Sequence, residues 1–142
     1  MPQASDHVMR TVCGTWAYCA PEVINHQPYT SAVDNWTLGV LMYILVSGYH
    51  PFDPYGNAPE PVLLRAILDC KYDFCDPVWN EISPEARELI SSLLRVRPEE
   101  RLSLETVLQS PWIQGNASER EMHHLLPRLS SLQYIKQRQQ QA

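Results

Sequence analysis

The chain is poor in lysine and has no concentrated positive charge. Lys71 and Lys136 are the only lysines among its 142 residues, and the formal net charge is −5. Nucleic acids and anionic membrane surfaces attract proteins through clustered lysine and arginine side chains. The sequence therefore predicts a protein with neither a nucleic-acid nor a membrane partner.

Long apolar runs are also missing. The longest, from Leu38 to Val46, is far shorter than the roughly 20 residues that a membrane-spanning helix needs. The N-terminus lacks the basic-then-apolar order of a secretory signal peptide. The cysteines include no C-x-x-C pair, which argues against both a zinc site and a disulfide framework. We expect a reduced protein in the cytoplasm or nucleus.

No segment shows the alternating pattern of a β-strand, and no internal repeat is present, whereas several segments show helical spacing. A first helix is predicted to begin near Thr30 or Ser31, either of which can cap it, and to run to about Ser47 before Gly48. Its apolar residues cover most of the helix circumference, so we expect this helix to be buried on all sides.

Three further helices are predicted. After a proline-rich loop over residues 49–59, a short amphipathic helix begins at about Glu60. Ser83 caps the next helix, with Pro84 at its first position and apolar residues at the i, i+3, i+4 spacing. Ser103 caps a third, which ends before Pro111. The fold class is therefore mainly α.

Several short motifs occur in a fixed order along the chain. Residues 11–22 read TVCGTWAYCAPE, and they are followed by DNWTLGV at 34–40, SGYHPFD at 47–53, PEERL at 98–102 and SPWI at 110–113. The first resembles the end of a protein-kinase activation segment, which closes on the A-P-E signature. Over about residues 8–114, the series resembles serine/threonine kinases of the calcium/calmodulin-dependent group, including checkpoint-type relatives.

This resemblance implies the helical lower C-lobe of a protein-kinase-like fold, with the N-lobe and catalytic loop absent. It divides the chain into an activation-segment remnant with the A-P-E region (1–30), a helical C-lobe subdomain (31–114) and a C-terminal helical or disordered tail (115–142). In the tail, Ser118 and Glu121 form a capping box for a further helix. Its basic residues are too dispersed to favour a calmodulin-binding helix.

The motifs that hold nucleotide in kinases do not occur here. The sequence has no G-x-G-x-x-G, no H-R-D and no D-F-G, and these motifs supply the groups that position ATP and its metal ions for phosphoryl transfer. We therefore expect no catalytic residue, cofactor-binding residue or metal ligand in this chain, with ATP and Mg bound in the parent kinase. The chain alone should be inactive.

Two interpretations of the function remain open. In the first, the chain is part of a serine/threonine kinase domain that transfers the ATP γ-phosphate to protein substrates, and it contributes the substrate-binding and activation-segment part. In the second, it is a non-catalytic helical interaction module or a regulatory short isoform. The first interpretation implies protein substrates and an upstream activating kinase as partners.

Individual site residues follow from the resemblance. Thr11 matches an activation-loop phosphorylation site, where added negative charge would recruit arginine and order the loop; otherwise it is an ordinary loop threonine. Thr15 and Tyr18 match the substrate-binding part of the segment. Trp16 stands where most relatives have proline, and we expect it to serve in packing.

Three structural residues complete the set. Glu22, the A-P-E glutamate, and Arg101 match a buried bidentate ion pair that anchors the substrate-binding segment to the helical lobe. Asp34 matches the aspartate at the start of the central helix, which binds the catalytic-loop backbone in kinases. An acid there also suits the helix dipole without any partner.

An acidic face near the peptide groove is a further possibility, and it would suit substrates with basic residues before the target hydroxyl. Its members would be Asp53, Glu60, Asp73 and Asp76. The alternative is a solvated charged loop, the usual situation for such residues.

Overall fold

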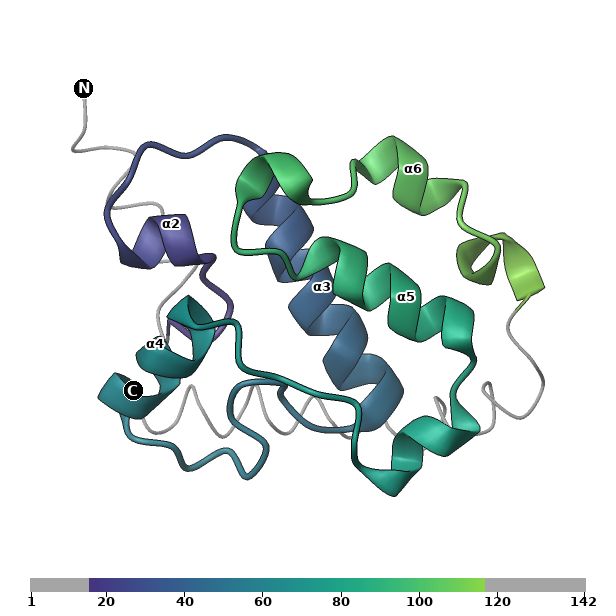
Figure 1. Ribbon diagram of the computed structural model, residues 1–142, viewed down its shortest axis with the longest axis horizontal. Helices are drawn as coiled ribbons and strands as arrows, with labels where there is room; N and C mark the ends of the chain where they lie inside the picture. Colours follow the sequence, from purple (N-terminus) through teal and green to yellow (C-terminus); the bar gives the residue numbers. More distant parts are fainter. Residues whose placement is uncertain (1–15, 117–142) are drawn as a thin grey trace.

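A computed structural model describes residues 16–116 and shows short helices and helical turns grouped around one long helix (Figure 1). The elements in chain order are α2 (Pro21–Ile24), α3 (Ala32–Ser47), α4 (Glu60–Leu68), η1 (Pro77–Glu81), α5 (Pro84–Leu93), η2 (Pro98–Glu100), α6 (Leu104–Leu108) and η3 (Trp112–Asn116). Between residues 16 and 116 the structure contains no β-sheet, only an isolated bridge between His50 and Asp53. The mainly α prediction is confirmed.

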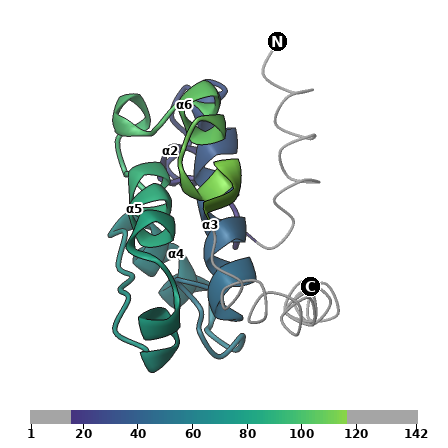
Figure 2. The ribbon, with the colours of Figure 1, turned by 90° about the vertical axis from the view of Figure 1, so that its right-hand side faces the viewer.

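Helix α3 is the centre of the fold, and α5 packs along it in both views (Figures 1 and 2). The two helices approach closely at Gly39, where an added Cβ would lie 2.9 Å from the Leu93 Cβ and 2.9 Å from the Leu94 Cδ2. Glycine is needed here for space. Elsewhere α2 contacts α4, and η2 contacts α3.

The helix starts follow the predicted caps closely. The Ser83 hydroxyl accepts a hydrogen bond from the Ala86 amide at 3.4 Å, and the Ser103 hydroxyl accepts one from the Thr106 amide at 3.3 Å. At the start of α3 the Thr30 hydroxyl accepts from the Ala32 amide at 3.2 Å, whereas the Ser31 side chain makes no capping bond. Thr30 is thus the capping residue of the two predicted candidates.

Besides η2 and η3, two short elements were not predicted. The first predicted helix begins near residue 30, but α2 already forms one helical turn with Pro21 at its start. Segment 77–81 forms η1, which Asp76 caps by accepting a hydrogen bond from the Val78 amide at 2.9 Å. Both begin with proline, whose fixed φ suits the first turn of a helix.

Aromatic rings pack in the core along both halves of α3. Tyr43 lies 4.8 Å from the Trp79 ring, and Trp36 stacks on Phe52 at 5.7 Å. The Tyr43 hydroxyl donates to the Asp73 carbonyl at 2.7 Å. These contacts hold the loops before and after α4 against the central helix.

One predicted property of α3 was wrong, because the helix is not buried on all sides. Leu38 and Leu41 are half-buried and Leu45 is 40% exposed. With Asp34 they occupy positions i, i+4, i+7 and i+11, which form one stripe of a helix. This stripe is only partly covered, since Leu38 packs against the core whereas Leu45 is exposed. Among residues 16–116, no helix is long and apolar enough to cross a bilayer.

Candidate functional site

The strongest polar contact of the described chain joins Glu22 and Arg101. The Arg101 Nη1 donates to the Glu22 Oε1 at 2.6 Å, and Nη2 donates to Oε2 at 2.7 Å. The Arg101 side chain is 0% exposed and that of Glu22 is 4% exposed. A planar guanidinium facing a carboxylate with two parallel bonds is the geometry that arginine makes and lysine cannot.

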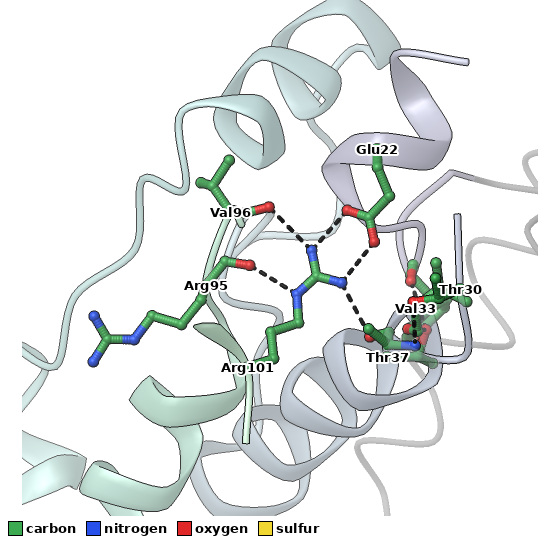
Figure 3. A network of polar contacts seen from close by, with 9 residues as sticks. Glu22, Thr30, Val33, Thr37, Arg95, Val96 and Arg101 are labelled. Carbon is green, nitrogen blue, oxygen red and sulfur yellow. Dashed lines mark hydrogen bonds and ion pairs between the residues drawn. The ribbon is translucent and has the colours of Figure 1, made fainter. Parts of the chain in front are cut away.

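Backbone carbonyls take the remaining donors of Arg101 (Figure 3). Its Nε donates to the Arg95 carbonyl at 2.8 Å, Nη1 also donates to the Ala32 carbonyl at 3.0 Å, and Nη2 to the Val96 carbonyl at 3.2 Å. All five N–H donors of the guanidinium are therefore used. The Arg101 Cζ also lies 5.2 Å from the centre of the Trp36 ring, within range of a cation–π contact.

Local structure brings these two residues together from 79 positions apart. Glu22 lies in the single turn of α2, directly after Pro21. Arg101 follows η2 in extended backbone, with φ −73° and ψ 142°, so its side chain reaches across the start of α3 to α2. One arginine thereby joins α2, the start of α3 and the segment after α5.

A second contact fixes residues that precede α2. The buried His50 imidazole lies with Nε2 2.8 Å from the Ala17 carbonyl, and its Nδ1 accepts a hydrogen bond from the Phe52 amide at 3.1 Å. Because Nδ1 accepts, the neutral ring carries its proton on Nε2 and donates it to Ala17. His50 therefore ties segment 16–20 to the loop after α3.

A third contact comes from α3 itself. The Thr37 hydroxyl lies 3.0 Å from the Tyr18 carbonyl and 3.2 Å from the Val33 carbonyl of the preceding turn. The Tyr18 ring also packs edge-on against His50, at 5.7 Å between centres. Two successive carbonyls, of Ala17 and Tyr18, are thus bound by side chains from α3 and from the loop that follows it.

The predicted site residues differ in burial, and some lie outside the described residues. Tyr18 is half-buried, and Glu22 and Arg101 form the expected buried bidentate pair. Asp34 is exposed at the start of α3, and its carboxylate makes no hydrogen bond or ion pair with another residue between 16 and 116. Thr11 and Thr15 lie outside the described residues.

The residue after Thr15 has an unusual backbone. The backbone of Trp16 has φ 59°, which lies in the left-handed region. Residues other than glycine, asparagine and aspartate rarely adopt this conformation. Its carbonyl accepts a hydrogen bond from the Cys19 amide at 3.0 Å. Proline could not adopt this φ, so the backbone at position 16 differs from that of relatives with proline there. The tryptophan side chain itself is half-buried.

The suggested acidic face is only partly present. Glu60, Asp73 and Asp76 are exposed, but Asp53 is 1% exposed and its Oδ1 accepts a hydrogen bond from the Ala58 amide at 3.0 Å. Including Asp53 in a solvent-facing acidic surface was therefore wrong. Its carboxylate organises the loop before α4 instead.

Sequence reasoning missed His50 and Thr37. Both lie in motifs that were quoted, but neither side chain has a periodic or spacing signal that reveals its acceptor 33 or 19 residues away. Within residues 16–116, no three His, Cys, Asp or Glu side chains are grouped so as to hold a metal ion.

The protein kinase domain is the family whose model matches this chain, over residues 2–113. This match covers most of the chain, so the chain belongs to the protein kinase domain family. The described helices are the C-lobe part of that fold, confirming the predicted fold class.

Curated relatives place the chain near the calcium/calmodulin-dependent serine/threonine kinases. It is 40% identical over 111 residues to the calcium/calmodulin-dependent protein kinase type IV of Mus musculus, covering 78% of this chain and 23% of that protein. It is 43% identical over 111 residues to the type 1 kinase of Caenorhabditis briggsae, covering 78% and 30%. A probable myosin light chain kinase of Dictyostelium discoideum is 39% identical over 132 residues, covering 92% and 33%.

A solved structure of the twitchin kinase region from C. elegans has the same fold, with TM-score 0.72 and 30% identity. That similarity covers 87% of this chain and 22% of the other. The chain spans a third or less of the length of these curated relatives.

Proposed function

We propose that this chain supplies the substrate-binding and activation-segment part of a serine/threonine kinase domain that transfers the ATP γ-phosphate to protein hydroxyls. The observation that carries the proposal is the anchoring of segment 16–22 at three points. The Ala17 carbonyl binds His50, the Tyr18 carbonyl binds Thr37, and the Glu22 carboxylate binds Arg101.

Anchoring of this kind suits phosphoryl transfer because that reaction depends on positioning the acceptor hydroxyl more than on covalent help from the protein. A segment held at 17, 18 and 22 would give Thr15 and Tyr18 a fixed base from which to contact a peptide. In this proposal Thr11 is phosphorylated by an upstream kinase, and the phosphate orders the segment through arginine contacts.

The motifs that bind ATP and its metal ions in protein kinases do not occur in these 142 residues. The sequence contains no glycine-rich loop, H-R-D or D-F-G motif, so ATP and Mg would be held by other parts of a complete kinase domain. The chain alone should neither bind Mg-ATP nor phosphorylate a protein. Cys19, Cys70 and Cys75 form no disulfide, which agrees with a cytoplasmic or nuclear location.

Calorimetric titration of the purified 142-residue chain with Mg-ATP tests this division of roles, together with a radiolabelled phosphate-transfer assay on a general protein substrate. No heat of binding and no incorporation are expected. Micromolar nucleotide affinity or any incorporation above a protein-free control would contradict it.

A non-catalytic interaction module is the second candidate, and the half-exposed stripe of α3 favours it, since exposed leucines on a central helix offer a surface for another protein segment. Transcript sequence upstream of the Met1 codon separates the two candidates. In-frame codons for H-R-D and D-F-G would support the kinase part, whereas a stop codon or an unrelated sequence would support the module.

A further inference from the structure

A groove lies between the C-terminal end of α4 and the end of α5, and of the anchoring contacts only the bonds of Arg101 to the Arg95 and Val96 carbonyls involve its lining residues. Its volume is about 460 Å³, and it is lined by Cys70, Tyr72, Ser91, Leu94, Arg95, Val96, Arg97 and Glu100. Pockets that hold small molecules in proteins range from about 300 to 1,000 Å³. The groove is thus large enough for a small ligand.

The lining divides into an apolar part and a polar part. Leu94 is buried, and the Cys70 thiol donates to the Leu94 carbonyl at 3.2 Å, so this side offers no free polar donor of its own. Tyr72 and Ser91 bring hydroxyl-bearing side chains to the same space. A ligand here would meet an apolar wall beside hydroxyl groups.

The arginines of the lining differ in their partners. Arg97 is held between two carboxylates, with Nη2 2.9 Å from Glu99 and Nη1 3.5 Å from Glu100. Arg95 makes no side-chain hydrogen bond or ion pair with any described residue, and only its carbonyl is used, by Arg101. Figure 3 shows its side chain directed away from the Glu22–Arg101 pair.

The positive charge of Arg95 affects the pKa values of two residues that line the groove. It lowers the pKa of both Cys70 and Tyr72, although burial raises each of these pKa values more strongly. Arg95 lines the same groove as these two residues. A guanidinium without an ion-pair partner has N–H donors that suit phosphate or carboxylate oxygens.

We propose that this groove binds a small anion, a phosphate or a carboxylate attached to a short aromatic or aliphatic group, with Arg95 holding the anion and the apolar wall holding the attached group. The site is separate from the anchored segment and does not rest on the proposed kinase role. Phosphate and carboxylate share the chemistry that Arg95 recognises, and the test distinguishes them.

Nuclear magnetic resonance titration of the full 142-residue chain tests the proposal. The probes are phenyl phosphate and benzoate, with phenol as the uncharged match and inorganic phosphate as the anion without an apolar group. Either aromatic anion should shift the amides of Tyr72, Arg95 and Arg97 at lower concentration than phenol or inorganic phosphate. The anion that binds more tightly identifies the preferred group.

Arg95→Gln should weaken binding of the preferred anion at least about tenfold, because a charge-assisted hydrogen bond is lost. Arg87→Gln, on α5 but outside the groove lining, is the matched control and should leave the affinity unchanged. The Arg95 side chain is exposed, so the variant should fold, and its amide spectrum checks this. No shift at the groove with either anion, or an unaltered affinity in Arg95→Gln, would overturn the proposal.

Discussion

At the residue scale, Arg101 makes side-chain hydrogen bonds to Glu22 and to three backbone carbonyls, and we expect stability to depend on it. Replacing it by alanine leaves the Glu22 carboxylate buried without its cation and removes donors from three backbone carbonyls. Stranding one member of a buried pair typically destabilises a protein by about 3 to 5 kcal/mol. We expect Arg101→Ala to lower the free energy of unfolding by that amount in urea melts of the kinase domain.

Arg97 provides the matched control for this measurement. It also pairs with two glutamates, but its side chain is 68% exposed, and exposed ion pairs contribute only about 0 to 1 kcal/mol. Arg97→Ala should therefore change stability little. A loss below about 1 kcal/mol for Arg101→Ala as well would mean that the Glu22 pair is not buried in solution.

Cys70 offers a second prediction at this scale. Burial raises the pKa of its thiol to about 11, against smaller opposing effects of Arg101 and Arg95. Since the thiolate is the reactive species, alkylation of Cys70 by iodoacetamide at pH 8 should be much slower than that of exposed Cys75. Its rate should rise steeply toward pH 11.

Mass spectrometry of tryptic peptides after timed alkylation measures both cysteines in one sample. In urea the difference between them should disappear, which provides the internal control. Equal rates in the native chain would show that Cys70 is accessible and ionised.

The sequence identified some of these residues and not others for a physical reason. Glu22 and Arg101 were found because they stand in motifs whose pairing is a property of the family. Asp53 was misplaced because its burial depends on a loop that turns back to present the Ala58 amide. Such a contact leaves no signature in composition or spacing.

At the scale of elements, the close approach of α3 and α5 makes a specific prediction. Gly39→Ala would place a methyl group 2.9 Å from both the Leu93 Cβ and the Leu94 Cδ2. Alanine improves helix propensity by about 1 kcal/mol, but overpacking between helices costs about 1 to 3 kcal/mol. We expect a net destabilisation of up to roughly 2 kcal/mol.

Asn35→Ala, one turn earlier on the same helix and only half-buried, is the control for propensity. It should be neutral or slightly stabilising in the same urea melts. If Gly39→Ala gained stability as well, α3 and α5 would have to lie farther apart than the structure places them.

His50 supports the anchored segment from a different element. His50→Ala removes the bond to the Ala17 carbonyl and the bond from the Phe52 amide. Each buried polar group left unsatisfied costs about 1 to 3 kcal/mol, so for these two groups we expect a loss of roughly 2 to 6 kcal/mol. Hydrogen exchange should quicken at Cys19 and Val23, whose amides bond within segment 16–24.

Tyr55→Ala is the control, because Tyr55 lies in the same loop but is 86% exposed. It should alter neither stability nor exchange. Unchanged exchange at Cys19 in His50→Ala would show that Thr37 and Arg101 suffice to hold the segment.

Helices with strong local signals were the predictable ones. Helices α4 and α5 begin at the residues their prolines and caps indicate, because those signals act within one turn. Elements α2 and η1 are four and five residues long, too short for periodicity to reveal them. They exist because the contacts of Glu22 and Trp79 hold them in place.

At the scale of the whole molecule, α3 shows why burial was overestimated. An apolar side chain in the sequence indicates that its position tends to be buried. It does not indicate which segment of the chain packs against it. Leu38, Leu41 and Leu45 lie on a side of α3 that is only partly buried.

Alkaline pH gives the prediction that involves the whole fold. Burial raises the pKa of Cys70 to about 11 from its ordinary 9.0, and it also raises the pKa of Tyr43 and Tyr72 above their ordinary 10.0. The folded state therefore keeps these protons at pH values where the unfolded chain has released them. Stability from this source is complete below pH 9 and is lost as the pH rises through the folded-state values.

Urea midpoints measured at pH 8, 9, 10 and 11 check this prediction. The midpoint should be constant from pH 8 to about 9 and then fall with increasing slope, because tyrosines begin to contribute near pH 10. Cys70→Ser removes the earliest contribution, so its midpoint should stay constant to about pH 10 before falling. A midpoint that stays level to pH 11 in the unmodified chain would show that these hydroxyl and thiol groups are solvated. The core around Tyr43 would then be looser than its ring contacts at 4.8 to 5.4 Å imply.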